Sequence, residues 1–166
     1  SSLPAEIIQS IEIIKGGSGS GATGGIININ TKRNKGRSSA GYAHTFGSFG
    51  LDKHALTFSR SAADWSGYLF LSKSYSRNDF QYKNHDEWNL PEKYAVRKFN
   101  DKKIYDLNLN LRHSNQYVNA DYKLLFQDYS KKLPGTIQNP DFFKNSRQTG
   151  QTFRHFLTLA KSIHDY

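Results

Sequence analysis

Residues 10–32 read SIEIIKGGSGSGATGGIININTK and hold two isoleucine-rich segments on either side of a glycine loop. Six of the ten residues from 16 to 25 are glycine, so the backbone there can adopt positive φ or lie close against another surface. The flanking isoleucines are β-branched and suit a pleated, half-buried strand. The pattern predicts a strand over 11–15, a loop over 16–25 and a second strand over 26–31.

The glycine loop also contains a match to the dinucleotide-binding pattern G-x-G-x-x-G, at residues 19–24. That pattern binds a pyrophosphate where it opens a helix and where an acidic residue follows about 20 residues later. Here residues 26–30 alternate as a strand, and neither Asp nor Glu occurs between Glu12 and Asp52. No Lys-Ser or Lys-Thr follows the glycines, as a Walker loop requires. We therefore do not expect nucleotide binding.

The composition points to a membrane β-structure. Apolar residues make up 36% of the 166 residues and aromatic residues 14%, which is too aromatic for a disordered chain and too polar for a well-filled soluble core. Strands of a transmembrane β-barrel alternate lipid-facing apolar residues with lumen-facing polar ones, and they account for both values. The chain has no run of 18 apolar residues, so no membrane-spanning helix is expected.

The chain has no cysteine and a formal net charge of +9. Without cysteine it can form neither a disulfide framework nor a thiolate metal site. Acidic residues are interspersed among the basic ones, and the densest basic cluster, residues 32–37, has no aromatic side chain on which a base could stack. Nucleic acid is therefore not an expected partner. The cluster is interpreted as a solvated linker, with anionic lipid headgroups as an alternative contact.

Beyond residue 39 the hydrophobic pattern has a period of two, the spacing of a β-strand. It predicts strands over 40–49, 52–61, 65–76, 102–113, 118–127 and 151–163, with a tight turn near 47–50. In 102–113 leucines alternate with Asp, Asn and Arg, whereas 65–76 is apolar on both faces and its orientation stays open. The polar side chains expected to face a lumen or a plug are Asp106, Asn108, Asn110, Arg112, Asn119, Asp121 and Lys123.

The lengths of the connections also favour a membrane barrel. Two of them are about four residues long, whereas the polar stretches 77–100 and 129–150 each exceed twenty residues. Outer-membrane barrels alternate short periplasmic turns with long extracellular loops. Six strands are too few to close a barrel, and they would leave open edges. We therefore expect an all-β fold: a fragment of about six strands from a transmembrane antiparallel β-barrel, preceded by the end of a plug domain.

Two motifs in the first 32 residues resemble the end of the plug domain in TonB-dependent outer-membrane receptors. Residues 4–16, PAEIIQSIEIIKG, are similar to the family's I-E-x-x-[KR]-G strand, and residues 21–32, GATGGIININTK, to its G-A-x-G-G-x-I-N-I-x-T-K finish. The likeness is closer to the cobalamin and siderophore receptors than to the glycan importers. Between the two motifs this chain is several residues shorter than the family pattern, which usually has a stretch ending in Tyr-Gly or Trp-Gly there.

The resemblance implies that residues 1–33 are the C-terminal part of a plug, 34–39 a linker and 40–166 the first six strands of a barrel of about 22 strands. It implies active import of a scarce ligand such as an iron–siderophore complex, haem or cobalamin. The TonB energy-transducing complex would drive this import through an N-terminal segment outside this chain. The implied location is the outer membrane of a Gram-negative cell, where lipid and a small-molecule ligand are the further partners and no cofactor is needed.

The ligand-binding candidates lie in the apical plug loop, which faces the ligand in the family, and in the two long loops, where aromatic side chains stand among charges. They are Gly17, Ser18, Gly19 and Ser20 in the plug loop and Tyr82, Trp88, Phe142 and Phe143 in the long loops. The alternative interpretation of these aromatics is an interface girdle or packing within the loops.

Neither a metal site nor catalysis is expected. His85, Asp86 and Glu87 are adjacent but have no partners at ligand spacing, and the six histidines form no pair at i, i+2 or i, i+4. No Ser/His/Asp set or paired carboxylate lies on a predicted rigid element. Two other functions stay open: an outer-membrane barrel that acts as an adhesin or a passive pore, and a soluble β-rich domain that binds glycans.

Overall fold

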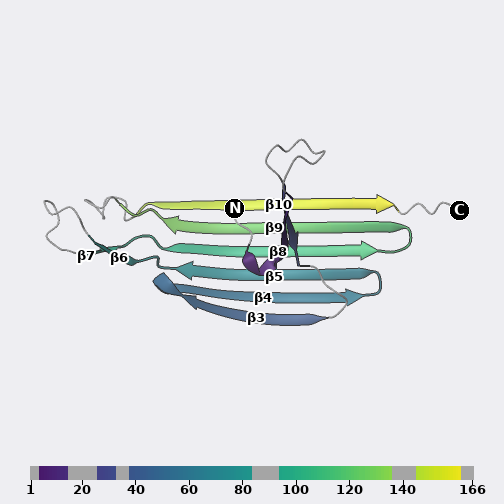
Figure 1. Ribbon diagram of the computed structural model, residues 1–166, viewed down its shortest axis with the longest axis horizontal. Helices are drawn as coiled ribbons and strands as arrows, with labels where there is room; N and C mark the ends of the chain where they lie inside the picture. Colours follow the sequence, from purple (N-terminus) through teal and green to yellow (C-terminus); the bar gives the residue numbers. More distant parts are fainter. Residues whose placement is uncertain (1–3, 15–25, 33–37, 84–93, 136–144, 162–166) are drawn as a thin grey trace.

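The computed structural model describes residues 4–14, 26–32, 38–83, 94–135 and 145–161. The described part is all-β, with 79% of its residues in strands and every strand pair antiparallel. One sheet has six strands, and two further sheets are two-stranded hairpins (Figure 1).

The elements follow the order that the sequence pattern predicts, with one additional hairpin. They are η1 (Ala5–Ile7), β1 (Ile8–Ile14), β2 (Ile26–Thr31), β3 (Ser39–Gly47), η2 (Ser48–Gly50), β4 (Leu51–Ala62), β5 (Trp65–Ser76), β6 (Phe80–Lys83), β7 (Tyr94–Arg97), β8 (Lys102–Ser114), β9 (Val118–Lys132) and β10 (Arg147–Lys161). The bounds predicted for β2 and β5 are confirmed. The tight turn near 47–50 is confirmed as η2, where Phe49 and Gly50 have φ of 59° and 69°.

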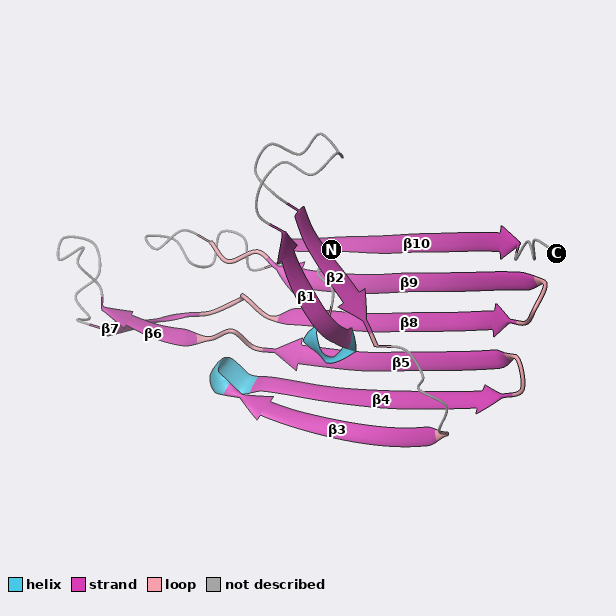
Figure 2. Cartoon of the chain, turned by 45° about the vertical axis from the view of Figure 1, so that its right-hand side comes forward, coloured by secondary structure: helices cyan, strands magenta, loops and turns pink. Residues whose placement is uncertain are grey.

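The six-stranded sheet is a meander in the order β10-β9-β8-β5-β4-β3, and the hairpin β6–β7 is inserted between β5 and β8 (Figure 2). Its two ends differ. We call the loop end the one with η2 and the connections from β5 to β8 and from β9 to β10. We call the turn end the one with the short turns from β4 to β5 and from β8 to β9. The long connections thus lie at one end, as predicted.

Both long polar stretches contain more strand than the sequence pattern predicts. The stretch 77–100 includes β6 and β7, which pair over Phe80–Lys83 and Tyr94–Arg97. In the stretch 129–150, β9 continues to Lys132 and pairs there with Arg147 of β10. At the ends of β9 and β10 the side chains are mostly polar on both faces, so the period of two fades although the backbone ladder continues. In β6 and β7 the period is present but lasts only four residues in each strand.

One face of the six-stranded sheet is apolar across its whole width. Directly opposed residues of antiparallel strands share a face, and two such rows cross all six strands. The first row is Tyr42, Leu56, Leu71, Leu107, Phe126 and Phe153, and the second is Ala40, Phe58, Leu69, Leu109, Leu124 and His155. We call this the apolar face. It is open to the surroundings, because Tyr42 and Phe153 at the two ends of the first row are 62% and 58% exposed.

The opposite face, which we call the hairpin face, is polar and carries η1 and the β1–β2 hairpin (Figure 2). The whole set predicted to face a lumen or a plug lies on it. Asp106 accepts hydrogen bonds from Ser72 Oγ at 3.0 Å and from Gln127 Nε2 at 2.8 Å. The small core lies here as well: Ile7 of η1 is 1% exposed and packs with Phe70, which is fully buried. Phe70 therefore points toward the hairpin, which settles the open orientation of β5.

The β1–β2 hairpin has an isoleucine side and a polar side. Ile11 pairs with Ile29 and Ile13 with Ile27, and these four side chains are 41–67% exposed. On the polar side Glu12 accepts hydrogen bonds from Asn28 and Asn30 at 3.1 and 3.3 Å. The expectation of half-buried isoleucines is therefore not met for these four, which the described residues leave mostly exposed.

Candidate functional site

Of the eight ligand-binding candidates, the structure describes one. Tyr82 lies on β6, half-buried, with its ring edge-on to Phe80 at 6.4 Å. Phe80 in turn lies edge-on to Phe49 of η2 at 6.1 Å, so an aromatic contact joins the β6–β7 hairpin to the tip of β3–β4. The other candidates, Gly17, Ser18, Gly19, Ser20, Trp88, Phe142 and Phe143, lie outside the described residues, as do His85, Asp86 and Glu87.

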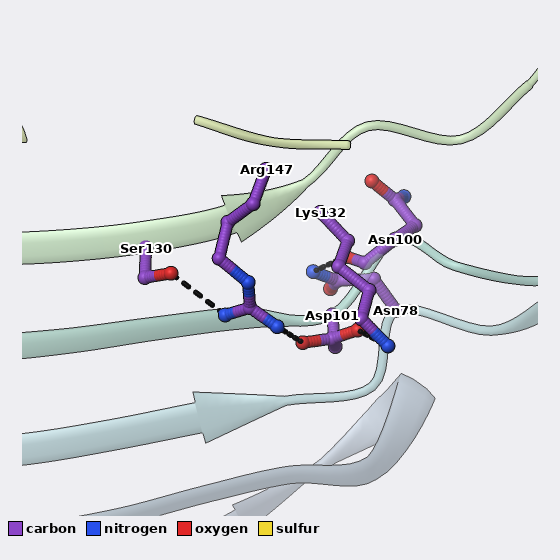
Figure 3. A network of polar contacts seen from close by, with 6 residues as sticks. All are labelled: Asn78, Asn100, Asp101, Ser130, Lys132 and Arg147. Atoms are coloured by element: carbon purple, nitrogen blue, oxygen red, sulfur yellow. Dashed lines mark hydrogen bonds and ion pairs between the residues drawn. The ribbon is translucent and has the colours of Figure 1, made fainter. Parts of the chain in front are cut away.

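A polar network joins strands β8, β9 and β10 at the loop end (Figure 3). Asp101, 19% exposed, forms ion pairs with Lys132 Nζ at 3.2 Å and with Arg147 Nη2 at 3.4 Å. Nη1 of Arg147 donates to Ser130 Oγ at 2.7 Å. Backbone bonds reinforce the network, because Lys132 N donates to the Asp101 carbonyl at 2.9 Å. One carboxylate thus holds the ends of both long connections together.

The start of the β5–β8 connection is fixed by Asn78. Its amide nitrogen Nδ2 donates to the Asn100 carbonyl at 3.0 Å (Figure 3). Its Oδ1 accepts from Ser76 Oγ at 2.7 Å. Asn78 has φ of 51°, a left-handed conformation that asparagine tolerates better than most residues. Binding residues are often found on loops whose first and last residues are held by a rigid scaffold. At the loop end, the sheet holds the two long connections in this way.

The hairpin face offers cationic side chains near the loop end. Lys102 of β8 and Lys131 of β9 are directly opposed in the register, and like charges so placed are destabilising. Both are half-buried rather than extended into solvent. An anion between the two ammonium groups would relieve their repulsion. This pair is therefore the part of the described loop end best suited to an anionic ligand.

The hairpin is docked on the sheet by an ion pair beside the apolar contact at Ile7. Lys53 Nζ of β4 lies 2.5 Å from Glu6 Oε1. Burial acts to raise the pKa of Glu6, but the hydrogen bond and the charge of Lys53 outweigh it, so the pKa is lowered from its ordinary value. Within the described residues, Glu6 Oε2 and the Tyr68 hydroxyl are buried without a hydrogen-bond partner.

A cavity of about 120 Å³ lies under the base of the hairpin. Polar side chains of the predicted lumen-facing set line part of it, among them Asn108, Asn110 and Lys123, and Ile7 and Ile29 close it from the hairpin. Most of the remaining lining is apolar. A cavity of this size has room for several water molecules, for which these polar side chains offer hydrogen-bond partners. The hairpin and the sheet therefore meet through a small apolar contact, one ion pair and a hydratable space, and not through a closely packed core.

Sequence reasoning missed one cluster of potential metal ligands. His44 of β3 and Asp52 and His54 of β4 bring one ligand atom each to within 4.8 Å of the others. His44 and His54 are ten residues apart in the sequence, which is not a spacing that brings two ligands together on one helix or one strand. The turn predicted near 47–50 could have revealed the cluster. A hairpin centred on residue 49 pairs position 44 with position 54, and the structure has this pairing.

The fold places the chain in the class of all-β proteins built on antiparallel sheets. In the part of the chain that the structure describes, no helix has the length and apolar character needed to cross a bilayer. The chain matches no protein-family model, and comparisons with curated proteins and with solved structures give no match.

Proposed function

We propose that this chain is part of a transmembrane β-barrel of the outer membrane, and that the protein is a TonB-dependent receptor that imports a scarce ligand. The opposed character of the two faces of the six-stranded sheet carries this proposal. The apolar face extends over six strands, and its side chains are exposed or half-buried on all of them. Water-soluble monomers rarely expose a contiguous apolar patch of such extent. Lipid is the surrounding that suits such a face.

The height of the apolar face supports a membrane location. At the loop end it is bounded by a polar row, His44, His54, Lys73, Tyr105, Asp128 and Gln151, and at the turn end by a row that contains Trp65 and His113. From His54 to Ala62, the β4 partner of Trp65, the strand spans nine residues, with Arg60 as a charged residue within the band. A tilted strand of about 9–11 residues crosses the hydrocarbon core of a bilayer, and the apolar band of outer-membrane barrels is bounded by aromatic girdles.

The hairpin on the polar face has the position of a plug. In a barrel the hairpin face would be the lumen side, and β1–β2 would occupy it. The sheet has edges at β3 and β10, and further strands would pair with them in a closed barrel. The exposed isoleucine side of the hairpin would pack against the rest of the plug. The limited contact between hairpin and sheet suits a plug that must rearrange during import.

The ligand that best fits the described loop end is anionic. Lys102 and Lys131 lie on the hairpin face, at the end where the long connections would meet the cell exterior. An anionic iron chelate or a haem with its carboxylates would pair with both ammonium groups. Cobalamin, which the resemblance also allows, would make less use of this pair.

Localisation and energy dependence test the proposal in the whole protein. We expect it in the outer-membrane fraction, with the heat-modifiable migration on gels that a closed barrel gives. Uptake of its ligand should stop when the TonB energy-transducing complex is deleted. Uptake that persists without that complex would indicate a passive pore, and outer-membrane binding without uptake an adhesin. A protein that stays in the aqueous fraction without detergent would refute the membrane proposal and favour a soluble binding domain.

A pair of charge variants tests the ligand class. We expect the double substitution Lys102→Gln/Lys131→Gln to weaken binding of the transported ligand at least tenfold, since each lysine contributes a charge-assisted contact. Lys103→Gln is the matched control, because Lys103 is adjacent in the chain but lies on the apolar face, over the Tyr105 ring at 5.3 Å. Equal binding by the double variant and the control would refute the assignment of the lysine pair.

A further inference from the structure

We propose that His44, Asp52 and His54 form a binding site for a divalent transition-metal ion, Zn²⁺ or Cu²⁺, at the loop end of the β3–β4 hairpin. The site rests on the geometry of these side chains alone and does not depend on the proposed transport function. Both histidines direct Nε2 toward the same carboxylate: His44 Nε2 lies 2.6 Å from Asp52 Oδ1, and His54 Nε2 lies 3.5 Å from Oδ2.

The three side chains converge because of the hairpin register. His44 is directly opposite His54, and their rings stack at 4.2 Å with an interplanar angle of 15°. Asp52 precedes His54 by two residues and so emerges on the same face. Ligand atoms in a tetrahedral zinc site lie about 2.0–2.2 Å from the metal and therefore about 3.3 Å from one another. The ligand atoms lie within 4.8 Å of one another, so they need adjustments of up to about 1.5 Å. Asp52 and the two stacked histidine rings, all partly exposed, would have to rotate by that amount to share one ion.

Tyr42 supplies an outer contact of the kind that metal-binding histidines have. Its hydroxyl lies 2.7 Å from His54 Nδ1. When Nδ1 carries the proton, it donates a hydrogen bond to the Tyr42 hydroxyl oxygen, and the lone pair of Nε2 is left facing Asp52. Ligand histidines usually donate their second ring nitrogen to an acceptor, which fixes the tautomer and the ring orientation. Tyr42 is therefore a positioning residue for the site.

The donor set selects the class of metal. Two imidazoles and one carboxylate suit Zn²⁺ and Cu²⁺, whereas Mg²⁺ and Ca²⁺ prefer oxygen ligands. Lys73 lies opposite His54 on β5 and is exposed, so solvent screens its charge. Three protein ligands leave a position for water or for an external ligand. A bound ion would join β3, an edge of the six-stranded sheet, to its neighbour near the turn.

The test measures metal stoichiometry of the whole purified protein, with any histidine tag removed, by equilibrium dialysis against Zn²⁺ followed by elemental analysis. The double variant His44→Gln/His54→Gln should bind one equivalent of Zn²⁺ fewer than the wild type. His155→Gln is the matched control, because His155 also faces a tyrosine, with Nδ1 3.4 Å from the Tyr122 hydroxyl, but is not part of the cluster. It should keep the wild-type stoichiometry. With Cu²⁺, electron paramagnetic resonance should show coupling to two imidazole nitrogens that the double variant lacks.

Equal zinc stoichiometry in the wild type and the double variant would overturn the site, and so would an equal loss in the His155→Gln control. Tyr42→Phe tests the positioning role. We expect it to keep the stoichiometry but to weaken zinc affinity about 10- to 100-fold, the usual effect of removing an outer-shell partner. An affinity equal to that of the wild type would overturn the role given to Tyr42. The four substituted side chains are at least partly exposed, so these substitutions leave the sheet folded. They are those of Tyr42, His44, His54 and His155.

Discussion

Replacing Ile7 by alanine tests whether η1 holds the β1–β2 hairpin on the sheet. Ile7 is 1% exposed and packs against Phe70 and Ala55, which are 0% and 5% exposed. Truncating a buried isoleucine to alanine costs about 2–5 kcal/mol, less where the surroundings can relax. The neighbouring cavity of about 120 Å³ allows such relaxation. We therefore expect about 2 kcal/mol, which raises the population of undocked hairpin about 30-fold.

Hydrogen exchange in the whole protein measures this effect element by element. The backbone amides of β1 and β2 should exchange about 30-fold faster in Ile7→Ala, whereas those of β8 and β9 should keep their wild-type rates. Ile7→Val is the graded control: it removes one methylene and costs about 0.5–1.5 kcal/mol, so its acceleration should be smaller. Unchanged exchange in β1–β2, or equal acceleration throughout the six-stranded sheet, would refute the view that Ile7 docks the hairpin.

Three further substitutions test the contacts described above. The pKa of Glu6 is lowered from 4.5, so the contribution of Glu6 to docking is full above that value and is lost as the pH falls through the lowered pKa. Spin labels on β2 and β9 should separate at acid pH, and Glu6→Gln should abolish this pH dependence. Asp101→Asn should weaken the hold on Arg147 by about 1 kcal/mol and speed protease cleavage between β9 and β10 severalfold. Gly150→Ala should lower unfolding stability by about 1–3 kcal/mol, because a Cβ there would lie 2.5 Å from the Tyr129 ring.

Each of these expectations has its own control. A label separation that is the same at acid and neutral pH in the wild type would contradict the role of Glu6. Asp128→Asn is the control for Asp101, because Asp128, on β9, is also near the loop end but is not part of the network. An equal cleavage rate in both variants would contradict the network. If the ring of Tyr129 causes the cost at Gly150, Gly150→Ala should cost little once Tyr129→Ser is present.

The six strands of the large sheet were predictable because the sheet has two unlike faces. In 102–113 the alternation of leucine with polar residues identifies both the strand and the side of each residue, and the structure places Asp106 and Asn108 on the hairpin face as expected. Strand 65–76 was predictable in extent but not in orientation. Phe70 makes the polar face locally apolar because Ile7 packs there, and that contact comes from a distant part of the chain.

Less of the candidate site could be read from the sequence. The ends of β9 and β10 are mostly polar on both faces, so no period distinguishes them from loop. The strands β6 and β7 do carry apolar or aromatic residues at alternate positions, but each is only four residues long and lies within a polar stretch. The cluster of His44, Asp52 and His54 depends on which residue is at the centre of the turn, and a shift of the register by one would separate the three side chains. The Asp101 network joins three strands whose relative stagger only the fold determines.

The meander also determines an order of assembly. Each strand of the large sheet is hydrogen-bonded to the one that precedes it, apart from the inserted β6–β7, so most contacts are local and the sheet can grow one strand at a time. The costly step is the addition of β8 to β5 across the insertion, because closing a longer loop loses more chain entropy. If β6 and β7 pair first, they shorten the effective loop. A hairpin outside the main sheet would then set the rate at which the second half of the sheet joins the first.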